Sequence, residues 1–296
     1  MPSPIAALLE PFTLDFFQRA LVGGSLVAIL CGVVGTWVVI RGMAFLGEAL
    51  AHGMLPGVAL STLLGVPVLV GGALSAVAMS LGIGVLQRRG KLSYDTSIGM
   101  LFVAMLALGI VIISHSGSFA TDATSILFGD ILAIASTDLI FLAIAAGVGL
   151  LVAAAAHRPL VALALDARVA ATLGLGPRSA QAALVGLVSL AVVASYQAVG
   201  SLLVVGLLLA PAVAAGHWTN RIPTRMTLAA VLGVAAVLVG LLVSWFAATA
   251  AGASVAATAI GFACLSWLVH STVTGLRSAT ARVAGPRSTT RLTTAR

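Results

Sequence analysis

The feature that most constrains this chain is a series of apolar runs that repeatedly reach or exceed 18 residues and carry almost no charge. A helix needs about 20 such residues to cross a hydrocarbon core roughly 30 Å thick. Only 8% of the 296 residues are charged, whereas an ordinary soluble domain has about 25%. Because the runs are continuously apolar and do not alternate, they exclude a β-barrel. The sequence predicts an all-α, polytopic membrane protein.

Nine apolar runs predict about nine transmembrane helices. An eight-helix version remains open, in which one of the shorter runs is re-entrant or lies in the membrane interface. The nine runs cover approximately 20–40, 44–64, 67–87, 97–114, 136–156, 180–197, 199–218, 227–249 and 253–271.

The basic residues give the expected orientation. They lie in loops that all fall on one side of the membrane if the chain crosses it nine times, as the excess of Lys and Arg in cytoplasmic loops requires. Glu10 and Asp15 place the N-terminus on the outer side. The net charge of +7 therefore reflects topology and does not indicate a nucleic-acid binder. These cytoplasmic loops contain Arg41, Arg88, Arg89, Lys91, His157, Arg158, Arg168, Arg178, Arg221 and Arg225.

The expected organisation has three parts. Residues 1–19 form an extracytoplasmic segment, and residues 20–271 form the transmembrane domain, with a cytoplasmic loop at about 158–178. Residues 272–296 form a cytoplasmic tail rich in Arg, Ser and Thr. We expect this tail to be disordered against anionic lipid headgroups.

Seven of the eight acidic residues lie in loops or at the ends of apolar runs, and the eighth lies within a run, with a histidine four positions later. Glu48 and His52 share a helix face at this spacing. At 1.5 Å per residue they lie about 10 Å and 16 Å past Arg41, so His52 is near the bilayer centre. Ionisable groups at such depth are costly and usually functional, although a Glu–His hydrogen bond that joins helices is the alternative.

The residues around this pair favour a transport site. Pro56 and Gly57 indicate an interrupted helix, which is typical of the midplane site of a transporter. Carboxylate oxygen with imidazole nitrogen suits Zn²⁺, Mn²⁺ or Fe²⁺ better than Ca²⁺ or Cu⁺. Two ligands from one chain are few, and a symmetric dimer supplies four.

The chain has no ATP-binding motif of its own around its single lysine, Lys91. Either an ATPase partner or an ion gradient must drive transport. In the loop at 158–178, Asp166 is a candidate helix N-cap, Gly174 a stop, and Pro177 prevents continuation. We expect a short amphipathic helix that presents Ala170, Leu173 and Leu175. It either docks into a partner's groove or lies on lipid.

Four segments together resemble the permease subunits of ABC-type zinc/manganese(/iron) uptake systems, the ABC-3 family. GEALAHGMLPGVAL resembles the family's G-D-A-L-x-H-x-x-L-P-G segment, and ILFGDILAI resembles its external F-G-D motif. LDARVAATLGLGP resembles its coupling loop, and VGSLLVVGLLLAPAVAA resembles its late segment with a Pro-Ala run. The segments occur in the family's order, and the resemblance extends from about residue 17 to 271.

The resemblance implies a metal-uptake permease of the bacterial plasma (inner) membrane. Its partners are a second permease copy (or a paralogue), two cytosolic ATPase subunits and an extracytoplasmic metal-binding protein. It implies no catalytic residue or resident cofactor in this chain, and the metal is the cargo. The family's ligand pair carries over to Glu48 and His52, with Glu where the family usually has Asp. Coupling to the ATPase is expected through Asp166, Arg168, Ala170, Leu173, Gly174 and Leu175, and Phe128–Asp130 is expected to be structural.

The sequence thus favours the permease subunit of an ATP-driven importer for Zn²⁺ or Mn²⁺, with Fe²⁺ as a third candidate. The alternative is a proton-coupled secondary transporter in which Glu48 alternates between its protonated and charged forms. A membrane enzyme or assembly scaffold is disfavoured, because no cluster of catalytic type accompanies the Glu–His pair.

Overall fold

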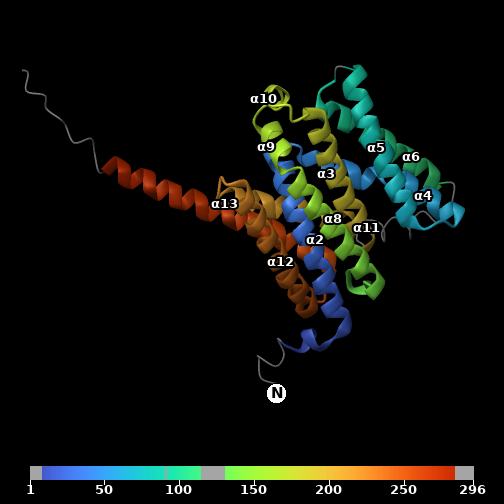
Figure 1. Ribbon diagram of the computed structural model, residues 1–296. Helices are drawn as coiled ribbons and strands as arrows, with labels where there is room; N and C mark the ends of the chain where they lie inside the picture. Colours follow the sequence, from blue (N-terminus) through green and yellow to red (C-terminus); the bar gives the residue numbers. More distant parts are fainter. Residues whose placement is uncertain (1–8, 91, 115–130, 284–296) are drawn as a thin grey trace, which may run out of the picture.

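The computed structural model describes residues 9–90, 92–114 and 131–283 (Figure 1). Throughout these ranges the ordered elements are helices and none is a strand, which confirms the predicted all-α class. The elements are η1 (Glu10–Thr13), α2 (Asp15–Ile40), α3 (Ala44–Gly53), α4 (Leu55–Leu64), α5 (Val68–Gly90), α6 (Tyr94–Ser114), η2 (Ile131–Ala133), α8 (Ser136–Ala155), α9 (His157–Leu165), α10 (Ala167–Thr172), α11 (Pro177–Gly216), α12 (Ile222–Ala247) and α13 (Ala251–Val283).

Seven helices of the described chain are long and apolar enough to cross a membrane, slightly fewer than the eight to nine expected. The difference arises at two of the nine apolar runs, which form shorter helices. The run at 44–64 divides into α3 and α4, and the run at 199–218 contains the helix Leu203–Gly216. The seven spans belong to α2, α5, α6, α8, α12, α13 and the first part of α11, Pro177–Tyr196.

The break between α3 and α4 falls at Met54. Pro56 follows in the first turn of α4. Proline has no backbone N–H, so the helical hydrogen bond that it would donate is lost. Beside the break, the Ser75 hydroxyl of α5 donates to the Gly53 carbonyl at 2.7 Å. Further along, a Cβ on Gly57 would lie on the carbonyl oxygen of Gly71, so α4 and α5 are in backbone contact.

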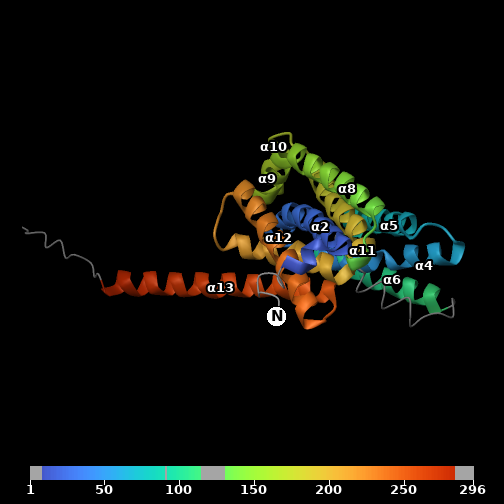
Figure 2. The same ribbon diagram turned by 90° about the horizontal axis from the view of Figure 1, so that it is seen from below.

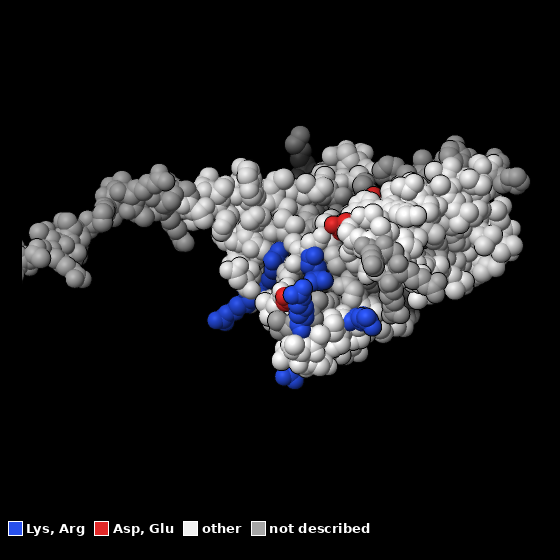
Figure 3. All heavy atoms as spheres, turned by 90° about the horizontal axis from the view of Figure 1, so that it is seen from above, with Lys and Arg blue, Asp and Glu red and all other residues white. Residues whose placement is uncertain are grey.

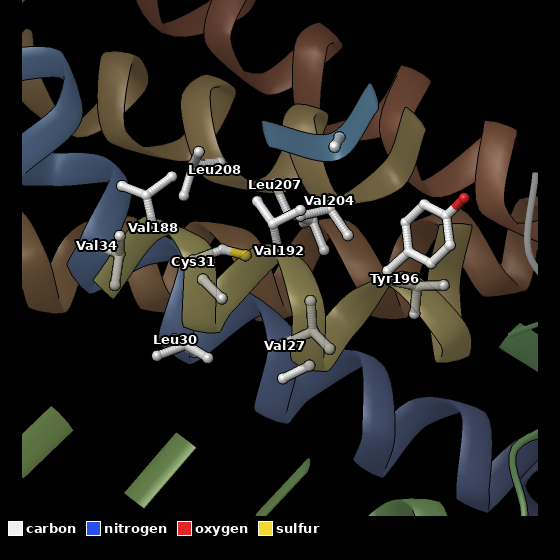
Figure 4. Packing of buried hydrophobic residues seen from close by; sticks show 14 of the residues in the cluster. Val27, Leu30, Cys31, Val34, Val188, Val192, Tyr196, Val204, Leu207 and Leu208 are labelled. Atoms are coloured by element: carbon white, nitrogen blue, oxygen red, sulfur yellow. The ribbon is translucent and has the colours of Figure 1, made fainter. Parts of the chain in front are cut away.

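Helix α11 is two helical arms joined at Gly200, whose φ of 74° and ψ of 165° lie outside the helical region. Such a positive φ is accessible to glycine without steric cost. Figure 4 shows Val188 and Val192 of the first arm opposite Leu208 and Leu207 of the second. The chain therefore folds back on itself at Gly200, and the two runs predicted at 180–197 and 199–218 are the arms of one hairpin.

Helix α2 is the centre of the bundle and packs on α8, α11 and α12 (Figures 1 and 2). Small residues on α2 allow close approach, as is common between membrane helices. A Cβ on Gly32 would meet the backbone of Ala230 at 2.7 Å, and one on Gly35 would overlap the Leu208 carbonyl oxygen. Trp37 is fully buried near the end of α2.

Helix α13 runs out of the bundle as a long extension (Figure 2). It continues past the expected boundary at 271 to Val283, so the first twelve residues of the expected tail are helical. The segment has no helix-stopping proline before Pro286, which accounts for the continuation. Residues 284–296 and most of the N-terminal segment, 1–8, lie outside the described residues.

Basic side chains gather on the face that carries α9 and α10 (Figure 3). This is the side expected to be cytoplasmic, where Lys and Arg concentrate. The exposed arginines of α9, of α10, of the start of α11 and directly before α12 are Arg158, Arg168, Arg178 and Arg221.

Candidate metal site and coupling helices

Glu48 and His52 lie one turn apart on α3, with Glu48 Oε1 and His52 Nε2 2.8 Å from each other. The spacing that predicted a shared face therefore produces a direct contact. The Glu48 side chain is 40% exposed and that of His52 is 21% exposed. One side of the carboxylate thus remains open to a ligand or to a second chain.

The opposite face of α3 fixes the direction of this pair. Leu46, Ala49 and Leu50 are fully buried there. A Cβ on Gly47 would meet Leu208 of α11 at 2.6 Å, and one on Gly53 would meet the sulfur of Met79 on α5. Because α3 is packed so closely on this side, Glu48 and His52 face away from the core.

Aromatic rings on α3 and α6 border the pair. The Phe102 ring meets the His52 ring edge to face, with centroids 5.8 Å apart. Phe45 approaches Phe102 in the same manner at 5.3 Å. These rings border one side of the His52 imidazole, whose Nε2 contacts Glu48.

The pair offers one oxygen and one nitrogen ligand, which suits a divalent first-row metal. Nowhere in the described ranges do three or more His, Cys, Asp or Glu side chains gather into a metal-binding group. His157 contacts Trp37, and His217 pairs with His270, with ring centroids 5.5 Å and 5.7 Å apart. A single copy therefore brings two ligands to the site on α3.

The predicted helix in the cytoplasmic loop is α10, and its expected ends are confirmed. The backbone N–H of Arg168 donates to Asp166 Oδ1 at 2.7 Å, so Asp166 is the N-cap. Gly174 has a φ of 68°, and the N–H of Leu175 donates to the Ala170 carbonyl at 3.0 Å. This pattern ends the helix with a left-handed glycine, and Pro177 then begins α11.

The predicted exposed face of this helix is wrong at one position. Ala170 is fully buried, whereas Leu173 is 63% exposed and Leu175 is half-buried. Because α10 has only six residues, it packs one side against its neighbours and has no long amphipathic stripe.

Helix α9 was not predicted, although it contributes the most exposed leucine of the loop. Leu165, at its last position, is 78% exposed. The signal in the sequence is Pro159 in the first turn, directly before the apolar run LVALAL, because proline is typical of helix starts. Leu165 and Leu173 thus stand exposed on either side of α10.

The family model described as the ABC 3 transport family matches residues 13–270. The chain belongs to the ABC 3 transport family. This confirms the resemblance found in the four sequence segments. The external F-G-D motif of ABC 3 permeases, Phe128–Asp130 here, lies outside the described residues.

Several relatives carry names from metal transport. The "Manganese transport system membrane protein MntC" of Halalkalibacterium halodurans is 36% identical over 244 residues, which cover 81% of this chain and 82% of the relative. A "Probable iron transport system membrane protein" of Haemophilus influenzae is 30% identical over 248 residues, covering 84% of this chain and 91% of the relative.

A solved structure titled "PsaBC from Streptococcus pneumoniae in complex with Fab" matches with a TM-score of 0.79 and 31% identity. The match covers 89% of this chain and 95% of that chain. Together with the seven apolar helices, family membership identifies a multi-pass ABC transporter permease of the bacterial inner membrane.

Proposed function

We propose that this ABC 3 permease imports a divalent transition metal, Mn²⁺ first, with Fe²⁺ and Zn²⁺ as the other candidates. An external binding protein delivers the metal, and two cytosolic ATPase subunits drive its movement. The observation that carries the proposal is the Glu48–His52 pair at 2.8 Å on an interrupted, closely packed helix. The manganese and iron names of the relatives support the choice of metal.

The chemistry of the pair suits transient binding. A carboxylate oxygen and an imidazole nitrogen match Mn²⁺, Fe²⁺ and Zn²⁺, and two ligands hold a metal less tightly than a closed four-ligand site. The open side of Glu48 leaves room for a second copy related by a twofold axis, which would add the same two ligands. We therefore propose a homodimer with the metal between the copies.

Glutamate in place of the family's usual aspartate changes the reach of the carboxylate. Glu48 Oε1 lies 2.8 Å from His52 Nε2 with this longer side chain. We infer that the longer side chain holds the ligands together before the metal arrives.

The metal assay is multi-element mass spectrometry of cells that express the chain with its ATPase and binding protein in metal-depleted medium. We expect selective gain of manganese. A strain whose ATPase lacks the phosphate-binding lysine of its P-loop is the matched control and should gain none. Gain that persists in this control and collapses with a protonophore would instead establish the secondary transporter with a titrating Glu48.

A second prediction concerns the surface on which the ATPase docks. We propose that Leu165 and Leu173, exposed beside α10, enter a groove of the ATPase. Leu173→Glu should reduce the ATPase recovered with the purified permease by about tenfold or more, because a charge would be buried in an apolar contact. Leu92→Glu is the control, since Leu92 is exposed in the loop between α5 and α6. Equal ATPase recovery from both variants would contradict docking at α10.

A further inference from the structure

Arg41 joins three elements that are distant in sequence. It follows the last residue of α2, and its Nη1 donates to the Leu163 carbonyl of α9 at 2.6 Å. Its Nη2 lies 3.4 Å from Gln181 Oε1 in the first turns of α11. The side chain is half-buried, and its Nε is buried without a hydrogen-bond partner. Arg41 therefore bridges the start of α3 and the cytoplasmic helices.

The contact of Arg41 with α9 lies at the C-terminal end of that helix, directly before α10. Leu163 lies in the last turn of α9, where backbone carbonyls lack partners within the helix. A cation is favoured there because the carbonyl dipoles point toward it, and the hydrogen bond is charge-assisted. Three residues later the chain passes through Asp166 into α10. Arg41 thus holds the segment that precedes the proposed ATPase contact.

The junction between Arg41 and α3 is rigid. The N–H groups of Gly42 and Met43 donate to the Val39 and Val38 carbonyls at 3.1 Å and 3.0 Å, which closes the end of α2. Met43 is the residue before α3, and Gln181 Nε2 lies 3.5 Å from its sulfur. A displacement of α9 would therefore move the beginning of α3.

A second contact connects the same elements. The fully buried Trp37, one turn before Arg41 on α2, meets the ring of His157 at the start of α9, with centroids 5.5 Å apart. The two ends of α9 thus contact the last turn of α2. Glu48 lies in the second turn of α3, seven residues after Arg41.

We propose that Arg41 is a positioning residue that transmits movement of α9 and α10 to Glu48 and His52. The inference rests on the proposed function, since it needs an ATPase that acts on α10. In this mechanism ATP binding displaces α9, and the Arg41 guanidinium carries the displacement into α3. The pair on α3 then changes its orientation toward the metal.

The test uses the full permease–ATPase complex in proteoliposomes, with Mn²⁺ and the binding protein. For Arg41→Gln, we expect Mn²⁺ uptake to fall about tenfold or more while basal ATP hydrolysis stays within about twofold, as loss of coupling between sites requires. Hydrolysis should no longer rise when loaded binding protein is added. Arg41→Lys, which keeps the charge but not the fork of donors, should restore part of the uptake.

Arg221→Gln is the matched control, because Arg221 also lies directly beside the end of a helix but its side chain is exposed. It should retain both uptake and stimulation. Uptake by Arg41→Gln within about twofold of wild type would overturn the inference, given the usual size of coupling effects. A parallel loss of uptake and hydrolysis in an intact complex would assign Arg41 a structural role and overturn it equally.

Gln181→Met provides a second variant if Arg41→Gln does not assemble. It keeps the guanidinium and removes its contact on α11. We expect about a threefold loss of uptake per ATP hydrolysed, within the range of coupling through neighbouring contacts. An unchanged ratio would overturn the inference. Absence of ATP-dependent uptake in the wild-type complex is a distinct result, because it would overturn the proposed function itself.

Discussion

His52→Ala is expected to abolish metal uptake while the permease still assembles with its ATPase. The substitution removes one of the two proposed ligands on α3 and leaves Glu48 without its partner at 2.8 Å. Changes to groups that only support metal ligands cost about 10- to 100-fold, so loss of a ligand should reduce uptake by at least roughly 100-fold. The measurement is time-resolved Mn²⁺ uptake in proteoliposomes that contain ATP.

His270→Ala is the matched control for this experiment. His270 of α13 is also half-buried, but its ring contacts those of His217 and Trp218, which follow the end of α11. We expect it to transport at near wild-type rate. Normal uptake by His52→Ala in a complex of normal composition would show that the Glu–His contact only joins helix turns.

Gly35→Ala is expected to destabilise the folded permease strongly. The alanine Cβ would overlap the Leu208 carbonyl oxygen. This oxygen belongs to the backbone, so no change of rotamer can relieve the clash. Overpacking in a core lowers the free energy of unfolding by about 1–3 kcal/mol. We expect a backbone clash at the centre of the bundle to cost at least the upper value of this range. We expect a melting midpoint in detergent lower by roughly 5–10 °C.

The comparison is Gly186→Ala on the first arm of α11, where a new Cβ meets nothing within 4 Å. Because alanine favours a helix more than glycine does, this variant should be neutral or slightly stabilised. Melting is followed by fluorescence-detected size exclusion after heating. Equal midpoints for the two variants would mean that α2 and α11 separate readily at Gly35.

The sequence predicted the long helices well, because each is a continuous apolar run whose length is set by the thickness of the bilayer. It predicted the count less well. The composition of 44–64 and of 199–218 resembles that of a full transmembrane helix. Pro56, however, interrupts the helix in 44–64, and Gly200 reverses the chain at the start of 199–218. Whether a proline or glycine breaks a helix depends on the packing around it, which a local pattern does not contain.

The contact between Glu48 and His52 was predicted because two ionisable residues at i and i+4 are conspicuous in an apolar run, and their role as metal ligands stays a prediction. The contacts of Arg41 were not, since Leu163 lies 122 residues away and the acceptor is a backbone carbonyl that any residue supplies. The orientation of Ala170 was also beyond the sequence. In a helix of six residues, the exposed side is chosen by neighbouring elements and not by periodicity.

The reversal at Gly200 has a consequence for how the chain is synthesised into the membrane. From Arg178 to Arg221 the sequence has no Asp, Glu, Lys or Arg between the two arginines. Neither arm therefore carries an orienting charge at the turn, and the flanking charges are both positive, on the side expected to be cytoplasmic. The insertion machinery must accept both arms together as one hairpin, whose orientation is set by its two ends.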